Sequence, residues 1–191
     1  YIMLGLGNSI TGGAALSAFN INDLSPKLWL AFNTGQGAIT DGIQWDDQSG
    51  NGSHASQTID AQEGSGFSGG AFVTDAGSQD NLDFAVTFNI TCAYHVFMVL
   101  NLSEESNETF LSSVDNASFM RFGQGGDNTS YRMKNGGTTV NITLSSGFGT
   151  DKAIAEVTRD SSNGIRVSKN GVSLGSGTGA GTFAVDQIGS S

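Results

Sequence analysis

Apolar residues occupy every second position over a long stretch in the middle of the chain, at Phe84, Val86, Phe88, Ile90, Cys92, Tyr94, Val96, Met98, Leu100 and Leu102. A repeat of two residues is that of a β-strand and excludes a helix. The odd positions are polar from Thr87 to Thr91 but apolar at Phe97 and Val99. We therefore predict an outer strand near residues 84–90, then a bend, and then a central strand near residues 94–102 that is covered on both faces.

Shorter apolar runs follow at intervals of roughly 8–12 residues, the spacing of strands in sandwiches and barrels. They predict strands at residues 110–114, 118–122, 131–134, 139–144, 153–159, 165–169, 172–174 and 183–188. Asn-Gly pairs that begin at Asn135, Asn163 and Asn170 predict tight hairpins, because both residue types adopt positive φ readily. The predicted fold class is all-β, an antiparallel β-sandwich.

The first residues of the chain lack this pattern and are mostly small. We predict an N-terminal arm over residues 1–25, which packs along the main domain or reaches a neighbouring subunit, and one domain over residues 26–191. A glycine-rich tract at residues 175–181 has no Lys and no following helical pattern. This composition favours a flexible loop over a phosphate-binding loop.

Composition and charge narrow the classes of partner. The chain of 191 residues has one Pro, one Cys and a formal charge of −10, so a disulfide scaffold is excluded. Residues 1–120 hold 13 acids and one base, whereas residues 121–191 hold seven bases and five acids. An acidic protein repels nucleic acid and anionic membranes, and no apolar run is long enough to span a bilayer. We therefore predict neither nucleic acid nor membrane as a partner.

Several segments together resemble a known family. They are Leu28-Trp29-Leu30, Trp45-Asp46-Asp47-Gln48-Ser49-Gly50-Asn51-Gly52-Ser53-His54-Ala55, the run 84–102, residues 153–159, residues 165–171 and Ile188-Gly189. In order and pattern they resemble a concanavalin A-like lectin/glucanase domain of the laminin-G-like type, over roughly residues 26–191. The resemblance implies a jelly roll. Variants of this module that start with Met-Leu-Gly-Leu-Gly, as at Met3, resemble structural proteins of tailed phages.

The resemblance also implies one more strand than the sequence contains. In such domains a loop and a last long strand follow the Ile-Gly pair, which here is Ile188-Gly189, two residues before the end at Ser191. An unpaired sheet edge is usually covered in proteins. We therefore expect a C-terminally incomplete jelly roll and a longer natural polypeptide.

The segment from Trp45 to Ala55 contains the candidate ligand-binding residues, Trp45, Asp46, Asp47, Asn51 and His54. An aromatic ring beside carboxylates, an amide and an imidazole suits a sugar, and its oxygen atoms suit calcium. The structural interpretation is favoured: Trp45 anchors the core, and Asp47 accepts backbone N–H bonds inside a turn made by residues 49–52. Acids crowd residues 46–83 without the spacing of a calcium-binding loop, so no metal or cofactor is predicted, with calcium as the alternative.

No catalytic motif is found. Glucanases of this fold carry carboxylates at alternate positions of one strand, and the only carboxylate cluster here, Glu104-Glu105-Ser106-Asn107-Glu108, follows a predicted strand end among turn formers. We therefore predict a protein that is not an enzyme.

The predicted function is that of a non-catalytic structural or adhesion protein of a virion surface, as a capsid decoration, fibre or tail-associated component. Its expected partners are other virion structural proteins and further copies of itself, with weak binding of a cell-surface glycan. Assembly contacts need area and symmetry rather than reactive groups. The alternatives are a soluble, extracellular carbohydrate-binding lectin domain and a glycan hydrolase of the same fold.

Overall fold

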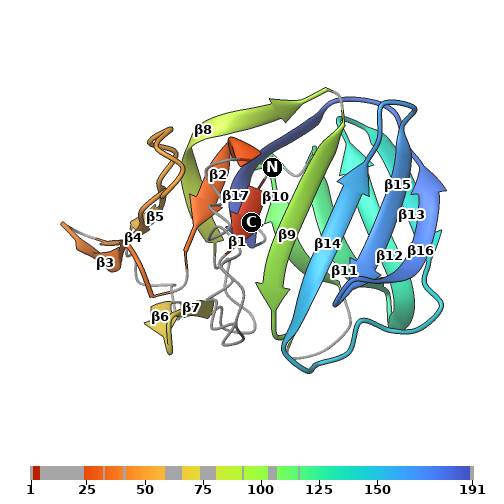
Figure 1. The fold of residues 1–191 in the computed structure, drawn as a ribbon, viewed down its shortest axis with the longest axis horizontal. Helices are drawn as coiled ribbons and strands as arrows, with labels where there is room; N and C mark the ends of the chain where they lie inside the picture. The colour runs from red at the N-terminus through yellow and green to blue at the C-terminus, as the bar shows by residue number, and fades with distance from the viewer. Residues whose placement is uncertain are drawn as a thin grey trace, which may run out of the picture.

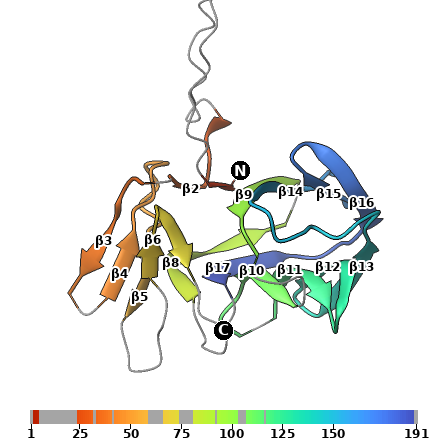
Figure 2. The ribbon, with the colours of Figure 1, turned by 90° about the horizontal axis from the view of Figure 1, so that it is seen from below.

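The computed structural model describes residues 2–4, 24–31, 33–40, 42–58, 66–73, 81–91, 93–102, 107–115 and 117–189. Within these residues the protein is an all-β sandwich of two large sheets and a small hairpin. Figure 2 shows the two layers, with β9, β14, β15 and β16 facing β17 and β10 to β13. No helix in this part of the chain has the length and hydrophobicity needed to cross a bilayer.

The smaller of the two large sheets has six strands. In spatial order they are β16 (Val172–Thr178), β15 (Gly164–Lys169), β14 (Ala153–Arg159), β9 (Tyr94–Leu100), β1 (Ile2–Leu4) and β2 (Leu28–Leu30). Strands β14, β15 and β16 form an antiparallel meander, and β9 pairs with β14 along its whole length (Figure 1).

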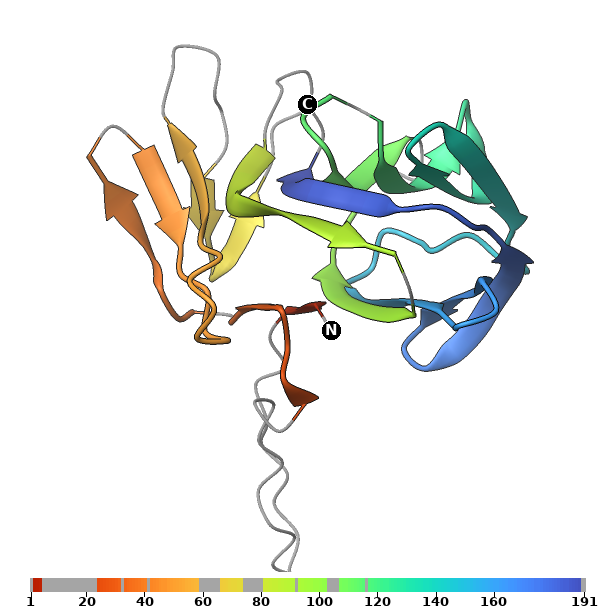
Figure 3. The ribbon, with the colours of Figure 1, turned by 90° about the horizontal axis from the view of Figure 1, so that it is seen from above.

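The larger sheet has nine strands. In spatial order they are β13 (Thr138–Thr143), β12 (Asp127–Asn135), β11 (Phe119–Gln124), β10 (Glu108–Ser112), β17 (Phe183–Gly189), β8 (Asn81–Ile90), β5 (Ala55–Thr58), β4 (Gly42–Trp45) and β3 (Gln36–Ile39). The separate hairpin joins β6 (Gly66–Ser68) to β7 (Ala71–Val73). In Figure 3 the orange strands β3 to β5 lie at the opposite end of the molecule from the blue β16.

The core lies between the two sheets and is rich in aromatic rings. Phe122 stacks on Phe148 with 4.4 Å between ring centroids and on Phe110 with 5.3 Å, and Tyr131 meets Phe122 edge-on. All four side chains are buried. Because alternate residues of each strand point inward, the period-two pattern of the sequence supplies this core directly.

The predicted strands from residue 110 onward are confirmed, with shifts of a few residues at their ends. The hairpin of residues 153–159 with 165–169 has the predicted apolar inner face, since Ala155, Val157 and Val167 are buried. The predicted turns are also found. Asn170 and Gly171 both have positive φ, as does Asn163, whereas the turn after β12 uses Gly136 and Gly137 instead of Asn135.

Two details of the prediction for residues 84–102 are wrong. Strand β9 is covered on one face only: Tyr94, Val96 and Met98 are buried, whereas Val99 is 37% exposed on the other face. Strand β8 is not an outer strand, because it lies between β17 and β5 inside the nine-stranded sheet. The apolar residues at odd positions of β9 predict a second covered face, but sheets also expose some apolar surface.

The glycine-rich tract is also not the predicted flexible loop. Its first residues belong to β16, and the tract packs closely against β13 at the edge where the two sheets meet. A Cβ atom at Gly175 would lie 2.7 Å from the carbonyl oxygen of Thr143, and one at Gly177 would lie 2.8 Å from Ile142. The glycines therefore allow the two sheets to approach each other at this side of the sandwich.

The predicted arm at residues 1–25 lies almost wholly outside the described residues. Within it, β1 pairs in parallel with β2 on one side and with Val96 and Phe97 of β9 on the other. The division into an arm and a domain over residues 26–191 stays a prediction, as does the closing strand expected after Gly189.

Replacing Gly175 by Ala is expected to lower the free energy of unfolding by about 1–3 kcal/mol, because the added methyl group meets a backbone carbonyl that a side-chain rotation cannot move away. Gly37→Ala is the matched control, since Gly37 also lies in a strand and a Cβ there meets nothing within 4 Å. Urea unfolding of the two variants checks this. Equal stability of both variants would show that β13 and β16 do not touch in solution.

Candidate functional site

The segment that joins β4 to β5 folds around the carboxylate of Asp47. One oxygen, Oδ1, accepts the backbone N–H of Trp29 at 3.0 Å and of Ser49 at 2.8 Å. The other, Oδ2, accepts the Ser49 hydroxyl at 2.7 Å and the backbone N–H of Ser53 at 3.0 Å. The side chain of Asp47 is therefore fully used inside the turn, as the structural interpretation predicts.

These hydrogen bonds control the charge of Asp47. Burial by itself raises the pKa of this carboxyl, but the hydrogen bonds from the Ser49 hydroxyl and from the N–H groups of Trp29, Ser49 and Ser53 outweigh burial and hold the pKa below its usual value. The folded protein therefore favours the ionised carboxylate, and no oxygen of Asp47 is left over for a ligand.

Trp45 is a core residue. Its side chain is buried, and its indole Nε1 donates a hydrogen bond to the carbonyl oxygen of Ala31 at 2.9 Å. Phe67 packs edge-on against the indole at a centroid distance of 5.8 Å. The predicted role of Trp45 as a core anchor is confirmed.

Asn51 ties the same turn to the segment that precedes β2. Its Nδ2 donates to the carbonyl oxygens of Pro26 at 2.9 Å and Lys27 at 3.2 Å, and to the hydroxyl of Ser49 at 2.9 Å. The amide nitrogen of Asn51 thus stabilises the turn through these hydrogen bonds.

Asp46, Asn51 and His54 are the predicted site residues whose side chains reach solvent. The imidazole Nδ1 lies 3.3 Å from Oδ1 of Asp46, and both side chains are more than 40% exposed. The backbone N–H of Asp47 also donates to this Nδ1 at 3.2 Å, and Gln44 donates to Asp46 at 2.6 Å. Ligand binding by Trp45, Asp46, Asp47, Asn51 and His54 stays a prediction.

No group of three His, Cys, Asp or Glu residues within the described ranges could hold a metal ion. Four of the acids that suggested calcium, Asp60, Glu63, Asp75 and Asp80, lie outside those ranges. Glu104 and Glu105 do so as well, whereas Glu108 begins β10. The alternatives of calcium binding and of glycan hydrolysis stay predictions.

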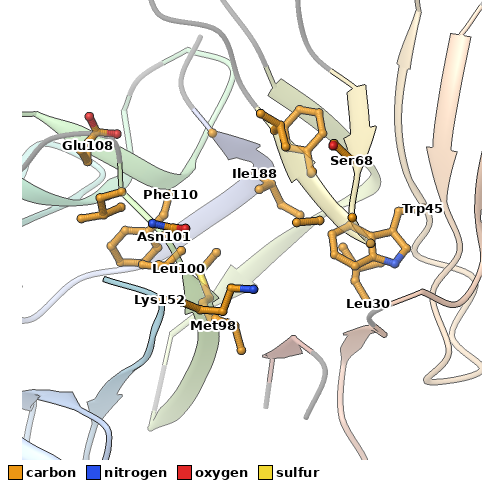
Figure 4. A pocket seen from close by; sticks show the side chains of 18 of the residues that line it. Leu30, Trp45, Ser68, Met98, Leu100, Asn101, Glu108, Phe110, Lys152 and Ile188 are labelled. Carbon is orange, nitrogen blue, oxygen red and sulfur yellow. The ribbon is translucent and has the colours of Figure 1, made fainter. Parts of the chain in front are cut away.

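The sequence did not indicate a pocket of about 580 Å³ that opens between the two sheets (Figure 4). Its apolar wall includes Leu30, Trp45, Met98, Phe110 and Ile188. Polar side chains stand around this wall, namely Ser68, Asn101, Glu108, Thr109 and Lys152. The lining residues come from segments that are far apart in the chain. The pocket therefore forms only when these segments come together in the folded protein.

One side of the pocket is a strand edge. Pairing between β9 and β1 ends at Phe97 within the described residues, and the next residues of β9, Met98 to Leu100, line the pocket. The hairpin turn from Ser68 to Ala71 forms another part of the wall and is held to β3 by a 2.8 Å hydrogen bond from Gln36 Nε2 to the carbonyl oxygen of Gly70. The pocket therefore combines an apolar floor with a part of β9 that, among the described residues, has no paired strand on this side.

Comparison with protein-family models and with curated proteins finds no match. Among solved structures, the chain is similar to the binding domain of Paraclostridial Mosquitocidal Protein 1, at 13% sequence identity and a TM-score of 0.47. The similarity covers 81% of this chain and 44% of that one, so the chain spans less than half the length of the structure that it matches.

Replacing Asp47 by Asn is expected to lower the free energy of unfolding at pH 7 by about 1–3 kcal/mol. One carboxylate oxygen, which accepts hydrogen bonds from the Ser49 hydroxyl and the Ser53 N–H, is replaced by an amide NH₂ group that cannot accept them. Since the pKa of Asp47 is lowered by folding, its carboxylate stabilises the protein above the unfolded-state pKa of about 3.9, and this stability is lost as the pH falls through the lower folded-state value.

Urea unfolding at several pH values between 7 and 2.5 measures this effect, and the difference between D47N and the wild type should shrink at the acid end. Asp46→Asn, in the same turn but exposed, is the control and should cost less at pH 7. A difference for D47N that is independent of pH would contradict the assignment.

Proposed function

We propose that this protein is a non-catalytic structural or adhesion protein of a virion surface, which binds neighbouring structural proteins and further copies of itself. The observation that carries the proposal is the pocket beside the edge of β9, with its apolar wall and its polar rim. The resemblance of residues 26–191 to a laminin-G-like jelly roll, together with the Met-Leu-Gly-Leu-Gly segment at Met3 that resembles variants in tailed-phage structural proteins, supports the virion as its location.

The pocket suits an extended segment of a neighbouring protein. Such a segment pairs its backbone with Met98 to Leu100 of β9 and places alternate side chains against the apolar wall at Leu30 and Phe110. Backbone hydrogen bonds then supply affinity, and the shape of the wall selects the side chains. This mode of binding needs no reactive group in either partner.

The polar rim supports a protein segment as the occupant. Glu108 and Lys152 carry opposite charges at the border of the pocket, and Asn101 is held in place by a 2.6 Å hydrogen bond to the carbonyl oxygen of Thr150. Charges of both signs around an apolar centre are the usual composition of a protein–protein interface.

Val99→Lys is expected to abolish incorporation of the protein into particles, because it places a charged side chain beside the edge of β9 where the partner segment pairs. Val172→Lys is the matched control: Val172 is 67% exposed at the turn between β15 and β16 and does not line the pocket. Both variants should unfold at the wild-type temperature, since both valines already contact solvent.

The measurement is the amount of each variant in purified particles, by quantitative mass spectrometry against the other particle proteins. The wild type and V172K should appear at one fixed copy number set by particle symmetry, and V99K should be absent. Equal incorporation of V99K would show that the pocket is not the contact. Absence of the wild type from particles, together with retention on a glycan array, would favour the lectin alternative instead.

A further inference from the structure

Two arginines face each other on the outer surface of the nine-stranded sheet. Arg121 of β11 and Arg132 of β12 are directly opposite in the strand register. Their neighbours in sequence, Met120, Phe122, Tyr131 and Met133, are buried in the core, so the two guanidinium groups lie on the face that points away from it. Like charges in directly opposite positions destabilise a sheet.

The described residues do not neutralise this pair. Neither arginine has a carboxylate within ion-pair distance among them, and the acceptor that both share is the neutral amide oxygen of Gln124. Arg132 Nη1 donates to this oxygen at 2.7 Å, and Arg121 Nη2 donates to the same atom. The neutral amide oxygen of Gln124 thus lies between two guanidinium cations. A negatively charged oxygen in this position would form stronger hydrogen bonds with both.

The guanidinium groups have donors to spare. Each carries five N–H donors and spends one on Gln124. The Nε atoms of Arg121 and Arg132 are buried and have no hydrogen-bond partner in the part of the chain that the structure describes. Burial first, and then the charge of Arg132, lower the pKa of Arg121.

The pair is held in place by an aromatic ring. The guanidinium carbon of Arg121 lies 4.7 Å from the centroid of the Phe119 ring and that of Arg132 lies 5.9 Å from it. Lys134 lies opposite Phe119 on β12, so three of the eight basic residues of an acidic chain gather on this small surface. The stacking orders the donors before any ligand arrives, which reduces the entropy cost of binding.

The surroundings of the pair are rich in hydroxyl and amide groups. Thr109 of β10 is opposite Arg121, and Asn141 of β13 is opposite Arg132, so the four side chains form one row across four neighbouring strands. At about 4.8 Å between strands the row spans roughly 14 Å, the length of a short oligosaccharide. Asp127, which is opposite Gln124, is engaged by the N–H and the hydroxyl of Thr129, each at 2.8 Å.

We propose that Arg121 and Arg132 form a binding site for the carboxylate or sulfate group of an acidic saccharide, with Thr109 and Asn141 as hydrogen-bonding partners for neighbouring sugar hydroxyls. The oxyanion takes the place of the Gln124 amide oxygen between the two guanidinium groups. The two arginines and Asn141 lie outside the pocket, whereas Thr109 also belongs to its lining.

Arginine side-chain NMR signals of the full chain test the site directly. Titration of sulfate against chloride at constant ionic strength should shift the Nε–H signals of Arg121 and Arg132 and leave that of Arg166 unchanged, since Arg166 lies on the other large sheet. Absence of any shift at the pair would overturn the proposal, and so would an equal shift at all three arginines.

Three polyanions then identify the source of the oxyanion: heparin carries sulfate on sugar, polygalacturonate carries carboxylate on sugar, and polyglutamate carries carboxylate on a peptide. Binding of heparin or polygalacturonate at the pair, each more tightly than polyglutamate, supports the proposal and tells sulfate from carboxylate. Equal or tighter binding of polyglutamate would overturn it in favour of an acidic protein segment.

Variants give the energetic contribution of the pair. Arg121→Gln should weaken binding of the preferred saccharide by roughly tenfold or more, the loss expected for charge-assisted hydrogen bonds. Arg132→Lys keeps the charge but loses the planar donors, and it should weaken binding by a smaller factor. Arg166→Gln is the matched control. Equal affinities of R121Q and R166Q, with R132K binding like the wild type, would show that only net charge matters and would overturn the site.

Discussion

The sandwich depends on the burial of two inward-facing sheet surfaces against each other, and this burial requires that both sides of the sandwich be closed. Hydrophobic burial is favourable only where water is excluded. On one side, the backbone of β16 lies against β13, where Gly175 and Gly177 leave no side chain in the way. On the other side, the sheets are joined by polar contacts around Asp47.

The contacts of Asp47 show how a turn can join two sheets. Strand β2, which contains Trp29, belongs to the six-stranded sheet, whereas the turn follows β4 of the nine-stranded sheet. The Asp47 carboxylate accepts the N–H of Trp29, and the N–H of Gln48 donates back to the carbonyl oxygen of Trp29 at 2.7 Å. The residues that suggested a ligand site in the sequence are thus largely those that hold the sheets together at the wall of the pocket.

Much of this fold could be predicted from the sequence, because side-chain alternation is a local property. The strands from β10 to β17 and the turn at Asn170 follow from residues close together in the chain. The strand role of Gly175 could not be predicted, since it depends on Thr143 of a distant strand. The outer face of β9 was misjudged because an apolar residue such as Val99 is compatible with both a core and a surface.

The candidate sites also differ in whether they depend on residues close together in the chain or on the pairing of distant strands. The turn around Asp47 is predictable from the sequence because an Asp two residues before a Ser is a familiar local turn. The pocket and the arginine pair were missed because each is made by register between strands. Arg121 and Arg132 stand 11 positions apart in the chain, and only the pairing of β11 with β12 brings them to one point.

Strand β1 has a further consequence for how the six-stranded sheet is assembled. Because β1 is parallel to both β2 and β9, those two strands run in the same direction and leave between them the width of a single strand. Any other chain that pairs with both must first displace Ile2–Leu4. The sheet with β1 between β2 and β9 and the sheet with another chain in that position are therefore mutually exclusive states. The difference between their pairing free energies sets their relative populations.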